Sequence, residues 1–228
     1  MASINELVSE MAHAVGQPNN HSVREQLRLA IIQTRNEVIR RSYENHNYVD
    51  RALVQRFKVS LRNVNDGEIT LPEGIEDSDI TKILRTEQAV PRPVRLTNNL
   101  PFDRVSTVGY KTNREIPFVK ETTARFVNKV PGLCGSHCYD YINGYIYIFP
   151  TGVNPFMGKY IIIESAFEHP NEIEYKSGNK TAAELELDDN QYILSEDMIG
   201  QIKEIIYKRD FFNNIRQNNE TSIDTKHV

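Results

Sequence analysis

Two cysteines and a histidine lie within the stretch Cys134-Gly135-Ser136-His137-Cys138. Thiolates and imidazoles are the ligands that zinc prefers, and a thiol with an imidazole is also the pairing of a cysteine nucleophile with its base. A structural zinc site needs about four ligands, and the chain has only 2 cysteines, so a second pair is missing. We interpret the stretch as a glycine-containing loop with free thiols and predict no bound metal.

Acidic residues gather between Glu184 and Asp197 and include the pair Asp188-Asp189. They lack the alternating register with which calcium loops direct carboxylates inward, so we expect them to face solvent. The chain also lacks the glycine-rich phosphate loops, nucleophile elbows and H-E-x-x-H motifs of common enzymes. We therefore predict a protein that is not an enzyme and uses no cofactor. A thiol or metal enzyme centred on Cys134 and Cys138 is the third hypothesis.

Basic and aromatic side chains are interleaved between residues 40 and 62. The cations are Arg40, Arg41, Arg51, Arg56, Lys58 and Arg62, and the rings are Tyr43, Tyr48 and Phe57. Such a pattern is typical of a surface that follows phosphates and stacks on bases. It also arises when rings at strand spacing enter a core and arginines stay in solvent. A nucleic-acid-binding module is therefore the second hypothesis.

The 228 residues have a net charge of -4, and this charge is distributed in blocks. Residues 1–65, 66–81, 82–129 and 130–228 have net charges of +3, -6, +6 and -7. Alternating blocks argue against one continuous basic surface and favour contacts between like copies through opposite patches. Apolar runs such as that from Tyr160 to Ile163 are far shorter than the roughly 18 residues of a membrane span, so we predict no membrane contact.

Three segments have the hydrophobic period of an amphipathic helix. The first opens with the capping box Ser3-Ile4-Asn5-Glu6, and the second opens with the capping box Ser22-Val23-Arg24-Glu25 and runs to about Tyr43. The third is predicted from Ser195 to about Arg216, with acidic residues at its start that suit the helix dipole. The two chain ends thus supply helices that need apolar partners.

The second helix is apolar over a wider arc than one packing partner requires. On the side opposite its main apolar stripe, the helix carries Arg24, Arg28 and Arg35. The same side also carries three apolar residues, Leu29, Ile32 and Ile39. We predict that these three residues are buried against another subunit.

Between residues 50 and 175 the hydrophobic period changes to two, which predicts strands. Nine of the 10 prolines fall between Pro72 and Pro170, a spacing that excludes long helices. Asn143-Gly144 separates two alternating runs and predicts a type I′ hairpin. Residues 159–164 are predicted as a strand that is buried on both faces.

The predicted fold class is α+β, with N- and C-terminal helices forming a small helical bundle and a proline-rich antiparallel β domain inserted between them. The expected divisions are a helical pair in residues 1–49, the β domain in 50–190, the closing helix in 191–216 and a polar tail in 217–228.

The capped helix pair, the proline-rich β excursion and the closing helix resemble the ring or adaptor proteins of the head-to-tail connector in short-tailed bacteriophages. More narrowly, the stretches Ser22-Val23-Arg24-Glu25-Gln26-Leu27-Arg28-Leu29-Ala30 and Tyr192-Ile193-Leu194-Ser195-Glu196-Asp197-Met198-Ile199 are similar to ring proteins of the crAss-like phages.

This resemblance implies a virion protein, assembled in the host cytoplasm, whose copies form a ring of about twelve under the portal. The ring would contact the portal and neighbouring ring or tail proteins. It would also line a channel through which DNA passes without sequence-specific binding. By the same resemblance, the residues that dock on the portal would be Phe211, Phe212, Ile215 and Arg216.

Overall fold

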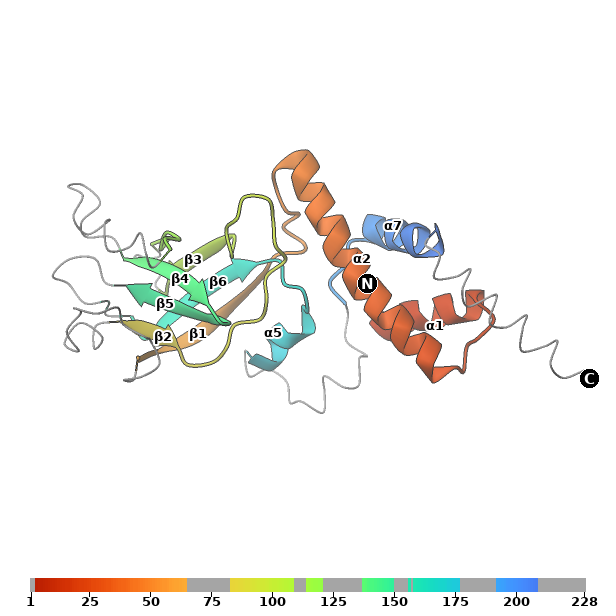
Figure 1. Ribbon diagram of the computed structural model, residues 1–228, viewed down its shortest axis with the longest axis horizontal. Helices are drawn as coiled ribbons and strands as arrows, with labels where there is room; N and C mark the ends of the chain where they lie inside the picture. The colour runs from red at the N-terminus through yellow and green to blue at the C-terminus, as the bar shows by residue number, and fades with distance from the viewer. Residues whose placement is uncertain are drawn as a thin grey trace, which may run out of the picture. The chain divides into compact units, whose positions relative to one another are not determined.

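A computed structural model describes residues 3–64, 83–108, 114–120, 137–149, 156, 158–176 and 192–208. The chain divides into two compact units, which are described separately. The helical unit comprises Met1–Leu53, Glu168–Tyr175 and Lys180–Val228, and the β unit comprises Val54–Phe167 with Lys176–Asn179. Helices and an antiparallel sheet confirm the α+β class (Figure 1).

The first helix of the helical unit, α1, spans Ile4–Ala14. Its predicted capping box is confirmed, because the Ser3 side chain accepts from the backbone of Glu6 while the Glu6 carboxylate accepts from the backbone of Ser3. Gly16 then adopts a φ of +75°, a conformation that few other residues tolerate, and the chain turns.

Helix α2 spans His21–His46. Its predicted capping box is wrong, because Asn20 is the N-cap and its Oδ1 accepts from the N–H groups of Ser22 and Val23 at 3.1 and 3.4 Å. Ser22 therefore lies inside the first turn. The helix also continues past Tyr43, and Asn47 ends it in the left-handed conformation with a φ of 57°.

Two further helices follow, namely α5 at Asn171–Lys176, which lies in this unit except for Lys176, and α7 at Glu196–Lys208. The predicted start of the last helix is confirmed, since the carbonyl of Ser195 accepts from Met198 at 3.1 Å. Both α1 and α7 pack on α2, and their facing residues form an apolar stripe on each helix. None of the helices in the described ranges is long and apolar enough to span a membrane.

The β unit contains an antiparallel sheet in the order β3-β6-β1-β2-β5-β4. The strands are β1 at Gln55–Asn63, β2 at Leu84–Thr86, β3 at Arg104–Thr107, β4 at Cys138–Ile142, β5 at Tyr145–Phe149 and β6 at Tyr160–Ser165. The predicted hairpin is confirmed as β4 and β5, with φ angles of 52° at Asn143 and 83° at Gly144.

Residues 114–120 connect the two edge strands of this sheet. The N–H of Ile116 donates to the carbonyl of Val105 in β3 at 2.8 Å, and the N–H of Val119 donates to Tyr139 in β4 at 2.9 Å. The segment therefore covers both open edges of a half-barrel, which removes unpaired backbone groups from solvent.

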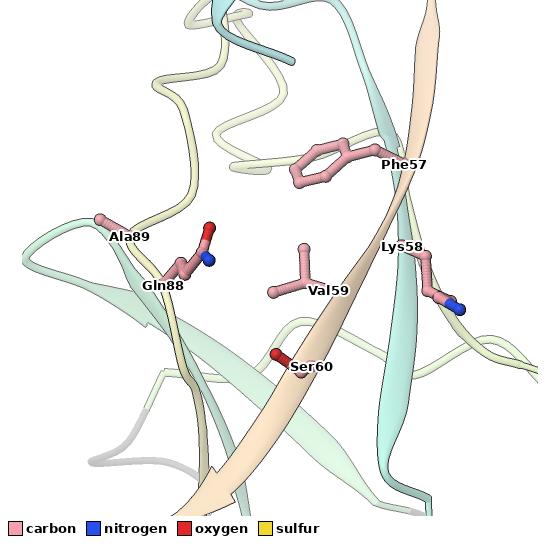
Figure 2. A pocket seen from close by; sticks show the side chains of 6 residues that line it. All are labelled: Phe57, Lys58, Val59, Ser60, Gln88 and Ala89. Carbon is pink, nitrogen blue, oxygen red and sulfur yellow. The ribbon is translucent and has the colours of Figure 1, made fainter. Parts of the chain in front are cut away.

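Aromatic side chains fill the concave face of the sheet. The Phe57 and Phe167 rings meet edge to face at 5.5 Å, and the rings of Phe102 and Tyr141 meet at 5.0 Å. Figure 2 shows Phe57 on one side of β1 and Lys58 on the other. The predicted burial of residues 159–164 on both faces is wrong, because burial alternates along β6. One face of this strand packs in the core, and the other carries Tyr160 and Glu164.

Candidate functional site

The predicted thiol and imidazole cluster is only partly described, because Cys134 lies outside the described residues. Cys138 is buried, and burial together with the nearby Asp140 raises the pKa of its thiol to about 11. His137 packs edge to face on Phe156 at 5.1 Å, and burial lowers the pKa of its imidazole. Cys138 is thus a neutral thiol at neutral pH rather than an activated thiolate.

Metal-ligating side chains do not gather in the described part of the chain, where no group of three or more His, Cys, Asp or Glu residues could hold an ion. The acidic stretch from residue 184 to 191 lies outside the described residues. A hollow of about 60 Å³ lies beside Phe57 and Gln88 of the β unit (Figure 2), and it is far smaller than the roughly 300 Å³ of a small-molecule site.

Cys138 is expected to resist alkylation in the folded protein. In a Cys134→Ser variant at pH 8, the raised pKa should make the reaction with iodoacetamide about a hundredfold slower than in the same variant unfolded in urea. The rate of thiol loss in the two states measures this effect. Equal rates would mean that the Cys138 thiol is accessible and ionised.

The three apolar residues predicted at a subunit contact occupy different environments on α2. Leu29 is 57% exposed, and Ile32 is half-buried. Ile39 is 1% exposed and packs within its own chain. An additional copy therefore has access to Leu29 and Ile32, which lie three residues apart and share one side of the helix.

Arg35, which we placed opposite the main apolar stripe of α2, is fully buried within its own chain. It lies on the same i, i+4 row as the buried Ile31 and Ile39. The buried arc of α2 is wide because α1 and α7 both pack on this helix. The spacing from Ile31 was the sequence signal that could have placed Arg35 in the interior.

The guanidinium of Arg35 binds the segment that enters α7. Its Nε donates to the carbonyl of Ile193 at 3.1 Å, and its central carbon lies 5.7 Å from the centroid of the Tyr192 ring. Desolvation lowers the pKa of Arg35, whereas the charge interaction with Tyr192 raises it. The next residue, Asn36, donates from Nδ2 to the carbonyl of Glu168 at 3.3 Å. The middle of α2 therefore anchors two segments that are distant in sequence.

The interleaved cations of the nucleic-acid hypothesis divide between the two units. Arg40, Arg41 and Arg51 belong to the helical unit, whereas Arg56, Lys58 and Arg62 belong to β1. Phe57 is a core residue and not a stacking platform. The portal-docking residues that the resemblance implied, Phe211, Phe212, Ile215 and Arg216, lie outside the described residues.

Comparison with known proteins identifies the class of this chain. The family model described as phage tail ring protein 2, from the crAss-like phages, matches residues 6–227. Because this match covers nearly the whole sequence, the chain belongs to that family, and the resemblance seen in the sequence is confirmed. The family indicates a structural component of the phage tail that assembles with other tail components. No curated protein matches the chain.

Proposed function

We propose that copies of this chain close into a ring that connects the capsid portal to the tail and lines the channel through which DNA leaves. The observation that carries this proposal is the family match over residues 6–227. A ring needs two different surfaces on each copy, related by an angle that closes after a whole number of copies. We take twelve copies as the number that the resemblance implies.

The helical unit is proposed as the wall of this ring. Helices α1, α2 and α7 would form a small bundle. The proline-rich β domain would be inserted in the chain between α2 and α7. Packing of α1 and α7 on α2 supports the bundle, and so does the ion pair between Lys203 and Glu10 at 2.6 Å, which joins α7 to α1. Leu29 and Ile32 would then contact the next copy.

Replacing Leu29 with aspartate is expected to convert the ring into monomers. A charge in the centre of an apolar contact costs about 2 kcal/mol or more, and the loss recurs at every contact around a closed ring. The mass of the purified protein measures assembly. Because Leu29 is exposed, the variant monomer should melt within about 1 °C of the wild-type monomer.

A Gln201→Asp variant provides the matched control, because it adds the same charge at an exposed position of α7. Rings from Leu29→Asp would contradict the assigned interface, and a monomeric wild type at high concentration would contradict ring assembly itself. The same measurement with a candidate portal protein tests the proposed docking of Phe211, Phe212, Ile215 and Arg216, since truncation before residue 211 should leave rings that no longer bind the portal.

A further inference from the structure

Basic side chains gather on the convex face of the sheet, across the neighbouring strands β3, β6, β1 and β2. The strand register places five cations on this face, namely Arg56, Lys58, Arg62, Arg85 and Arg104. The acidic residues among them are Glu164 and, directly after β2, Glu87. We call these seven residues the basic sheet face. Its net charge is +3, although the chain as a whole carries -4.

The strand register places two arginines directly opposite each other on this face. Arg62 lies directly opposite Arg85 across the β1 and β2 ladder, and like charges in such a pair repel. Glu164 lies between Arg104 and Arg56 in the strand register. Its Oε1 forms an ion pair with the Nε of Arg56 at 3.2 Å. This ion pair neutralises Arg56 in part, and the other cations keep the face positive.

A tyrosine contributes to the same face. Tyr160 is 42% exposed, and the Nζ of Lys58 lies 4.5 Å from the centroid of its ring. A hollow of about 540 Å³ is lined in part by Arg62, Lys159 and Tyr160. Ammonium, guanidinium and phenol groups are all donors that bind phosphate oxygens.

The composition of the face favours a nucleic-acid backbone over a protein partner. The cores of protein interfaces are depleted in charge and centred on apolar anchors, whereas DNA interfaces are polar and strongly positive. Ile162, opposite Lys58, is half-buried, and the central carbon of Arg85 lies 4.2 Å from the centroid of the Tyr145 ring. Four strands about 4.8 Å apart spread the cations over a width of about 14 Å. A rod of closely spaced phosphates fits such a surface better than a single acidic peptide strand does.

We infer that the basic sheet face is the surface with which this protein contacts the phosphate backbone of duplex DNA, independently of sequence. The inference rests on the proposed channel, because it names the surface that would meet the DNA. Binding is electrostatic, so it weakens steeply as salt displaces the protein from the phosphates.

The test measures the fluorescence anisotropy of a labelled duplex of arbitrary sequence titrated with the full-length protein at several salt concentrations. The Arg56→Gln/Lys58→Gln variant should bind more weakly by about tenfold for each cation removed at 0.1 M salt. The slope of the logarithm of the association constant against the logarithm of the salt concentration is negative, and its magnitude should decrease by about two. Both side chains are exposed, so the fold should persist.

The matched control is Arg41→Gln/Lys208→Gln, which removes the same charge from exposed helical positions. This control should bind DNA as the wild type does. Equal weakening in both variants, or no wild-type binding at low salt, would overturn the inference. Loss of assembly in the β1 variant with DNA binding unchanged would also overturn it and would point to an acidic protein partner. Mass measurements report ring formation separately. A failure to form rings can therefore be distinguished from a failure of this face to bind DNA.

Discussion

An Arg35→Ala variant is expected to melt roughly 6–12 °C below the wild type, from a loss of about 3 kcal/mol. The substitution removes the donor to the carbonyl of Ile193 and the cation that lies against Tyr192. It also leaves a cavity between α2 and the segment that enters α7. Thermal unfolding followed by circular dichroism measures the effect.

Two further variants separate the causes of this loss. Arg35→Met keeps most of the side-chain volume but cannot donate a hydrogen bond, so it should recover the packing part of the loss alone. Arg41→Ala removes an exposed arginine from the same helix, where its pair with Glu37 is worth little. If Arg35→Ala and Arg41→Ala melt alike, Arg35 does not hold the α7 entry segment in solution.

Local chemistry explains which parts of the fold were predictable from sequence. Ser3 and Glu6 reach each other within one helical turn, and Asn143-Gly144 accepts positive φ angles without help from distant residues. Such features depend on a few neighbouring side chains. The second capping box was wrong for an equally local reason, because Asn20 stands two residues ahead of Ser22 and accepts from the N–H groups of Ser22 and Val23, which starts the helix at His21.

Features that depend on distant segments were not predictable in the same way. Arg35 is buried because residues more than 150 positions later in the chain supply its acceptor. The segment 114–120 bonds to β3 on one side and to β4 on the other, and no periodicity within it indicates both partners. The basic sheet face likewise required the register, since Arg85 and Arg104 lie far in sequence from Arg56 and Lys58.

The candidate subunit interface shows the same difference between local and long-range features. Leu29 and Ile32 were identified from the width of an apolar arc, which is a local property of one helix. The width of the arc does not show which of its residues are covered by other helices of the same chain. Ile39 lies on the covered part, because α1 and α7 both pack on α2.

An Ile202→Asp variant should lose more than about 4 kcal/mol and detach α7 from α2. Ile202 is 2% exposed at the centre of the stripe that also contains Met198 and Ile206. An aspartate there either buries an unpaired charge or takes up a proton at a free-energy cost. Detachment would also separate Lys203 from Glu10. Thermal unfolding and the rate of proteolysis within residues 196–208 measure both consequences.

The matched control is Tyr207→Asp, which introduces the same side chain on the same helix at a position that is 40% exposed. Its loss should stay below about 1 kcal/mol, most of it from a negative charge near the helix C-terminus. Similar melting of the two variants would mean that α7 does not pack through Ile202. Because a ring wall built from α1, α2 and α7 requires this packing, that outcome would also remove the helical bundle from the proposed assembly.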